Sequence, residues 1–190
     1  MKSSKLALII FITFFIKSVY GQSDTIKYWS KVDTLKWSDF QGPVNAKSSF
    51  DANTNSGLIY HWQVNFQGDS SKFSFTVNSF VNKHKSWVRT GFQKPRLLKH
   101  EQLHFDISEF FARKLLDDFN AYKYTSDYRN DIVKIFTRLQ TSRQIMEDKY
   151  DEQSNHSLNA EWQQWWERYV AYLLQNNISY QKAMDGIPKK

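Results

Sequence analysis

The segment LLKHEQLHFDISEFFARKLL, residues 97–116, decides the fold, because its apolar residues recur at steps of three and four. This period is typical of an amphipathic α-helix, and the pattern extends from near Arg96 to near Phe119. His100 and His104 lie four positions apart within it, and Glu101 follows the first histidine. Residues four apart share one helix face, so both imidazoles are predicted to point in the same direction.

Two further helical patterns follow this segment. One begins near Asp127, with acidic residues in its first turn, and continues past Met146. The next begins near Ser157 or Asn159, either of which can cap it, and carries an aromatic stripe. At helical spacing such a stripe favours a core face, and a stacking platform for sugar rings or a peptide is the alternative. The stripe consists of Trp162, Trp165 and Trp166.

Upstream of residue 95 the apolar residues alternate with a period of two. GLIYHWQVNF (57–66) and KFSFTVNSFV (72–81) each place apolar side chains on one face, and QGDSS between them is a turn signal. The pattern predicts a long antiparallel hairpin with one buried face, joined by strands from TIKYW (25–29) and DTLKWSDF (33–40). Strands followed by helices indicate an α+β domain.

The first 21 residues are typical of a secretory signal peptide. Lys2 and Lys5 precede the apolar run LALIIFITFFI (6–16), and Val19 and Gly21 form a small-residue pattern before Gln22. We therefore expect an exported, periplasmic or secreted protein with one domain over residues 22–190. The alternative is an uncleaved amino-terminal anchor, which Lys17 and Tyr20 in the cleavage region favour.

Composition narrows the chemistry that is available. The chain has no cysteine, so a thiol nucleophile and disulfides are excluded. Residues 1–21 hold three lysines and no acid, so their removal lowers the net charge from +7 to +4. The remaining basic residues form no dense block, which argues against a nucleic-acid partner, although contact with an anionic envelope surface is compatible with this charge.

The letters His100-Glu101-Gln102-Leu103-His104 form the HExxH arrangement of zinc metallopeptidases. In that chemistry two imidazoles and a third protein ligand hold one Zn²⁺, and the glutamate is the general base for a water molecule. Two alternatives remain: histidines on a half-polar helix face without a metal, and an exported metal-containing binding protein without catalysis, which holds an envelope polymer or a protein.

The third ligand is expected from the segment YDEQSNHS, residues 150–157. An antiparallel second helix returns towards the start of the first, and counting at about 1.5 Å per residue places Met146 level with His100. Asp151, Glu152 and His156 then all emerge near the metal face. His156 is favoured because it is the other histidine of this neighbourhood and a neutral nitrogen suits Zn²⁺, while Asp151 is an alternative ligand or the carboxylate that orients His156.

Two more side chains have predicted roles near this centre. Asp106 can hydrogen-bond the outer nitrogen of a metal-bound imidazole and fix its tautomer. Tyr150 can donate a hydrogen bond to a developing oxyanion, although packing against the first helix is the favoured role. A peptide substrate is expected to bind along a sheet edge, for which the strand around residues 73–81 is our choice.

Three stretches together resemble a bacterial family described as secreted zinc-dependent proteases, the domain of unknown function 922. They are SWV (86–88), LLKHEQLHFDISEFFARKL (97–115) and YDEQSNHSLNAEWQQWW (150–166), and LKWSDFQG (35–42) fits the family's opening. The resemblance implies a zincin-like peptidase and includes Asp106, Asp151 and His156. Ser154 stands where the family has threonine, and Ser157 where it has glycine.

We predict that the mature protein begins at or close to Gln22, because the charged, apolar and small-residue regions before it occur in the order that signal peptidase requires. Mass spectrometry of exported material measures the amino terminus directly. Exported protein that retains Met1 would contradict the prediction.

Overall fold

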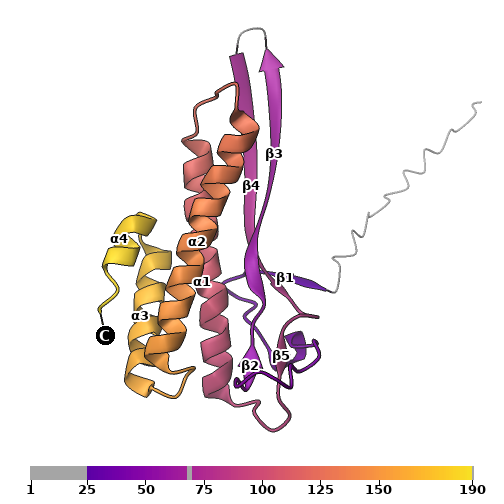
Figure 1. Cartoon of the computed structure of the whole chain (residues 1–190), viewed down its shortest axis with the longest axis vertical. Helices are drawn as coiled ribbons and strands as arrows, with labels where there is room; N and C mark the ends of the chain where they lie inside the picture. Colours follow the sequence, from indigo (N-terminus) through magenta and orange to yellow (C-terminus); the bar gives the residue numbers. More distant parts are fainter. Residues whose placement is uncertain (1–24, 68–69, 190) are drawn as a thin grey trace, which may run out of the picture.

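The computed structural model describes residues 25–67 and 70–189, and the predicted signal peptide lies outside them. The α+β class is confirmed, because an antiparallel sheet precedes four helices in the described part of the chain. Figure 1 shows a long hairpin along one side, two long antiparallel helices beside it, and two shorter helices on the far side. The long helices are α1 (Pro95–Asn120) and α2 (Tyr128–Ser154), and the shorter ones are α3 (Ala160–Gln175) and α4 (Tyr180–Asp185).

The predicted hairpin is confirmed. Strands β3 (Ser56–Gln67) and β4 (Ser70–Asn82) pair antiparallel, from Ser56 opposite Val81 to Gln67 opposite Ser70. The short strand β1 (Ile26–Tyr28) pairs with the other edge of β4 at Phe80–Asn82, so β4 is the middle strand. Alternate side chains of the hairpin pack against the helices, as the period of two predicted; they include Tyr60, Trp62, Phe73, Phe75 and Val77.

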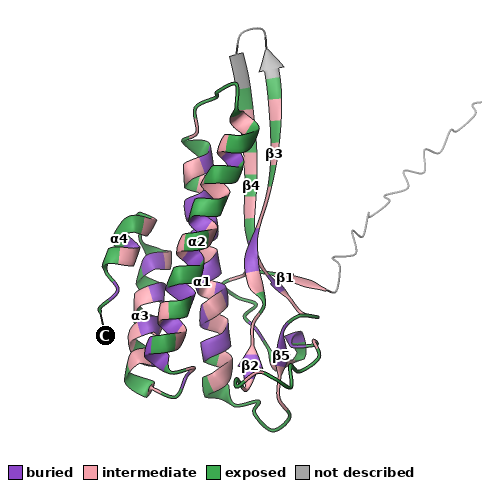
Figure 2. Ribbon diagram, viewed as in Figure 1, coloured by how far each residue is buried: buried purple, intermediate pink, exposed green. Residues whose placement is uncertain are grey.

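Helix α1 lies at the centre of the molecule and contacts β4, α2 and α3. It begins at Pro95, whose missing amide hydrogen is no loss at the first helical position. Its apolar stripe is fully buried, and the aromatic stripe of α3 adds Trp166, which is also fully buried, to the same core. The core role predicted for Trp166 is therefore confirmed, and Figure 2 shows the buried residues along the facing sides of the helices. Among the described helices, none has both the length and the apolar character needed to cross a bilayer.

The predicted strand at DTLKWSDF is wrong. The segment forms a short 3-10 helix, η1 (Trp37–Asp39), inside an otherwise irregular stretch. The backbone amide of Lys36 donates to the Asp39 carboxylate at 2.9 Å, and the amide of Leu35 is held by the side chain of Gln102 on α1 at 2.7 Å. These bonds occupy the backbone groups that a strand ladder needs.

Two features were not predicted from the sequence. Strand β2 (Ala52–Asn53) pairs with β5 (Trp87–Val88) in a second, two-stranded sheet. Helix α4 begins after Ser179, whose hydroxyl accepts from the Lys182 amide at 3.4 Å. A two-residue strand is too short for an alternating pattern to reveal it.

Helix α2 ends in a left-handed turn of three consecutive non-glycine residues. The φ angles of Asn155, His156 and Ser157 are 47°, 49° and 74°. Left-handed backbone costs about 1–2 kcal/mol for an ordinary L-residue and is tolerated better by asparagine. The turn brings His156 back over the end of α2, where its amide donates to the Asp151 carbonyl at 3.1 Å.

The substitution Ser157→Gly is expected to stabilise the protein by about 0.5–1 kcal/mol, because glycine adopts positive φ without steric cost and this gain exceeds its extra entropy when unfolded. Urea unfolding followed by circular dichroism measures the difference. Asn155→Gly is the matched control and is expected to gain less. A Ser157→Gly protein less stable than its parent would contradict the explanation.

Candidate metal centre

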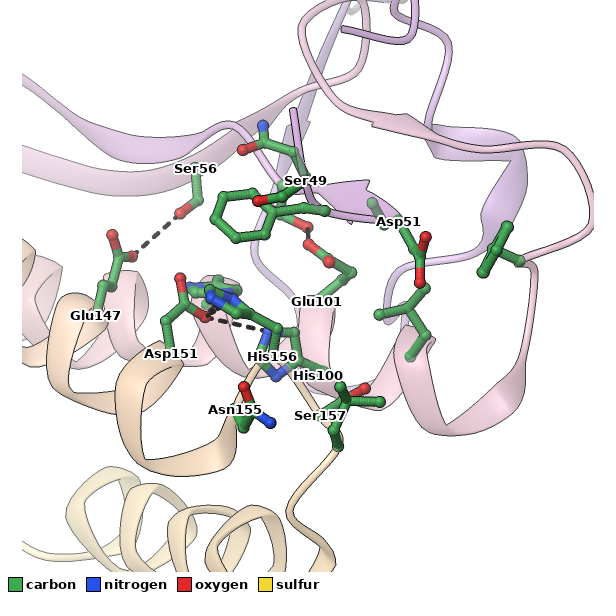
Figure 3. A pocket seen from close by; sticks show the side chains of 18 of the residues that line it. Ser49, Asp51, Ser56, His100, Glu101, Glu147, Asp151, Asn155, His156 and Ser157 are labelled. Carbon is green, nitrogen blue, oxygen red and sulfur yellow. Dashed lines mark hydrogen bonds and ion pairs between the residues drawn. The ribbon is translucent and has the colours of Figure 1, made fainter. Parts of the chain in front are cut away.

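The last turn of α2 meets the amino-terminal half of α1 at a cluster of imidazoles and carboxylates. The Asp151 Oδ1 atom lies 3.1 Å from Nε2 of His100 and 3.1 Å from Nε2 of His104. Figure 3 shows the imidazole groups gathered around the Asp151 carboxylate. His100 and His104 therefore share one helix face, as their spacing predicted, and the chain places a carboxylate directly opposite them.

These three residues fit a metal ion. Each offers one ligand atom, and the three atoms lie within 4.8 Å of one another. The Asp151 Oδ1 atom is buried and has no hydrogen-bond partner among the described residues, although two nitrogens lie close to it. An oxygen and two nitrogens that direct lone pairs at one another repel unless a cation or protons lie between them. A bound divalent ion satisfies all three atoms at once.

The electrostatics of the cluster also favour positive charge. Burial by itself lowers the pKa of His104, but the Asp151 carboxylate in close contact with it, together with the charges of Glu147 and Glu101, raises it to about 9. Burial by itself raises the pKa of the Asp151 carboxyl, but the imidazoles of His100 and His104 in close contact with it hold it far below its usual range. The two shifts have one cause: a carboxylate stabilises the charged form of an imidazole beside it, and a charged imidazole stabilises the carboxylate.

Glu101 is 3% exposed and belongs to the same cavity. The hydroxyl of Thr54, in the segment between β2 and β3, donates to Glu101 Oε2 at 2.6 Å. Such a short bond to a carboxylate fixes one oxygen and the rotamer of the side chain. Thr54 is a site residue that the sequence did not reveal, because it lies 47 positions away.

The structure groups Asp151, and not His156, with the two histidines of α1. His156 lies just outside the group: its Nδ1 is 3.5 Å from Asp151 Oδ1, and its side chain is 38% exposed. The ring packs on Phe50, with centroids 4.2 Å apart. That His156 is the third ligand stays a prediction. Asp151 has one oxygen close to both histidines, which its alternative role as a ligand requires.

Asp106 and Tyr150 have other contacts than the predicted ones. Asp106 Oδ1 accepts from Trp29 Nε1 at 2.7 Å and from Gln102 Nε2 at 2.8 Å, so it anchors the amino-terminal segment and does not orient an imidazole. Two positions beyond His104 on a helix, it faces away from the cluster.

Tyr150 is fully buried and packs on the His100 ring, with centroids 4.6 Å apart. Its hydroxyl lies 2.9 Å from Gln163 Oε1 and 3.2 Å from the His100 carbonyl oxygen. These contacts agree with the packing role, because Tyr150 is not among the residues that line the cavity.

A cavity of about 830 Å³ surrounds the cluster. Residues 49–56 line one side of it without interruption, and α1 and α2 line the other. At one end the buried Arg143 donates to Glu147 Oε1 at 2.6 Å, and the Ser56 hydroxyl reaches the same oxygen at 3.4 Å. Burial raises the pKa of Glu147, opposed by the charge of Arg143. The strand at residues 73–81, which was expected to bind the substrate, does not line this cavity; residues 49–56 border it instead.

No protein-family model, curated protein or solved structure matches this chain. The family resemblance therefore stays a prediction that depends on the sequence motifs.

We expect Asp151→Asn to weaken zinc binding by at least about 100-fold, because loss of an outer partner alone costs about 10–100-fold and Asp151 offers a direct ligand atom. His156→Ala is expected to bind zinc as tightly as the parent. Competition with a chromophoric chelator at fixed pH measures both affinities. If His156→Ala alone caused a large loss of zinc affinity, His156 and not Asp151 would be the third ligand.

Proposed function

We propose that the protein is a zinc-dependent peptidase, with His100, His104 and Asp151 as metal ligands and Glu101 as general base. The observation that carries the proposal is the buried Asp151 Oδ1 atom, which has two imidazole nitrogens at 3.1 Å and no hydrogen-bond partner in the described chain. Two histidines and one carboxylate form a ligand set that catalytic zinc sites use, with one position left for water or substrate.

A zinc ion bound there lowers the pKa of a water molecule and polarises the carbonyl group of the scissile bond. Glu101 takes a proton from that water molecule and returns it to the leaving amine nitrogen. Thr54 holds Oε2 of Glu101, which leaves the other carboxylate oxygen for the proton transfer. A metal kept for structure alone has no need of a carboxylate fixed in this position, and closed structural sites usually have four protein ligands.

The substrate that fits this cavity best is an extended peptide laid beside β2. The amide of Arg89, which follows β5, donates to the Asp51 carbonyl at 2.8 Å. Consecutive residues of a strand direct their backbone groups to opposite sides, so Ala52 directs its amide and carbonyl away from β5. An added peptide strand can pair with these groups, and its side chains then lie in the cavity beside residues 49–56.

Export completes the proposal. The signal peptide predicted for residues 1–21 and the resemblance to secreted zinc-dependent proteases support action outside the cytoplasm, on protein or peptide substrates.

Glu101→Gln is expected to keep about one zinc ion per chain and to lose hydrolysis by about 10²–10⁴-fold, because the amide cannot accept the proton but no ligand is removed. Metal analysis and cleavage of a fluorescently labelled unfolded protein measure the two properties. His104→Ala is the control that should lose both. Equal activity of Glu101→Gln and the parent would refute the peptidase function, and so would a parent that a zinc chelator does not inhibit.

A further inference from the structure

Helix α3 contributes no ligand atom to the group formed by His100, His104 and Asp151. One of its side chains, Gln163, nevertheless contacts the His100 ring. The Oε1 atom of Gln163 lies 3.1 Å from Nδ1 of His100, the ring nitrogen on the far side from Asp151. Gln163 is 3% exposed and lies within the aromatic segment EWQQWW, residues 161–166. A buried amide among tryptophans is costly unless its polar atoms are satisfied, so its contacts are informative.

The contacts of Gln163 determine which way its amide points. The Nε2 atom donates to Glu167 Oε1 at 3.1 Å, one turn further along α3. The Oε1 atom accepts from the Tyr150 hydroxyl at 2.9 Å. A flipped amide would place its oxygen against the Glu167 carboxylate, where neither group can donate. Glu167 therefore holds the amide oxygen towards His100, and in this orientation the oxygen can also accept from the Tyr150 hydroxyl, whose other acceptor is the His100 carbonyl at 3.2 Å.

This orientation determines the tautomer of His100. An amide oxygen is only an acceptor, so Nδ1 of His100 must carry the hydrogen that it receives. In a neutral imidazole the lone pair is then on Nε2, the atom that faces Asp151 Oδ1 at 3.1 Å. Metal-binding imidazoles are commonly fixed in this manner by a partner on the outer nitrogen.

We propose that Gln163 is a positioning residue of the metal centre, which holds His100 in the tautomer and ring orientation that present Nε2 to the ion. Glu167 acts through Gln163 by fixing the direction of its amide. The proposal concerns metal affinity, and it rests on the proposed function only for the identity of the ion as zinc. Through these contacts α3 influences the metal although it holds none of the ligands.

Gln163→Leu is expected to weaken zinc binding by about 10–100-fold, the usual cost of losing such a partner, because His100 is then free to take the other tautomer or to turn. Chelator competition at fixed pH measures the affinity, and the visible spectrum of the Co²⁺-loaded protein reports the ligand geometry. The spectrum of Gln163→Leu is expected to differ from that of the parent.

Gln153→Leu is the matched control. Gln153 is also buried, at 4% exposure, and also joins two segments, through Trp166 Nε1 at 2.9 Å and the Pro188 carbonyl at 2.8 Å. It is expected to lower the stability to a similar degree while the zinc affinity and Co²⁺ spectrum stay as in the parent. This comparison separates a role at the metal from a role in packing.

A double variant tests the direction of the hydrogen bonds. In Gln163→Glu/Glu167→Gln a carboxylate accepts from Tyr150 and His100, and the amide at position 167 donates to it, so zinc affinity should return at least to the parental level. If Gln163→Leu does not fold, Glu167→Ala at its partly exposed position still tests the proposal, since it removes the acceptor for Gln163 Nε2 and loss of the fixed amide direction should weaken zinc binding.

Parental zinc affinity and Co²⁺ spectrum in both Gln163→Leu and Glu167→Ala, with zinc lost in His104→Ala, would overturn the role of Gln163 and leave the proposed function intact. A parent protein that binds no zinc would instead overturn the proposed function.

Discussion

A carboxylate oxygen and two imidazole nitrogens meet in a buried space where α1 touches the end of α2, and much of the surrounding structure serves to hold them there. The lone pairs of the three atoms repel one another unless a cation or protons lie between them. Helix α1 is therefore fixed on several sides. The sheet and α2 bury its apolar stripe, α3 reaches His100 through Gln163, and the segment after β2 reaches Glu101 through Thr54.

Two other residues of α1, Gln102 and Asp106, have a structural role of their own. Gln102 and Asp106 face away from the cavity and bind the amino-terminal segment, through the Leu35 amide and the Trp29 indole. Leu35 and Phe40 then pack with Phe105 in a second apolar cluster. The pattern HEQxHFD thus combines the face of the candidate metal site with an anchoring face on one helix. Ser157 adopts a left-handed backbone conformation, which glycine would adopt without steric cost.

Sequence periodicity was sufficient for the hairpin, for helices α1, α2 and α3, and for the shared face of His100 and His104, because each depends on local pattern. Periodicity was insufficient where contacts between residues distant in sequence determine the local structure. The segment at residues 33–40 is not a strand, since Gln102 occupies the Leu35 amide. Counting along the helices placed Met146 level with His100, but Tyr150 lies there, about one turn later, because the count ignored the span of the 121–127 connection. Thr54 and Gln163 carry no motif, and only the packing of separate elements brings them to the site.

The groups of the metal centre come from four distant parts of the chain: Thr54 before the hairpin is complete, His100 to His104 in the middle, Asp151 at the end of α2, and Gln163 in α3. A chain that emerges from its amino terminus carries both histidines and Glu101 long before their partners exist. The complete arrangement forms only when almost the whole sequence has folded. The proposed hydrolase would therefore be inert while it is still an extended polypeptide, and it could not digest itself during synthesis or during the proposed export.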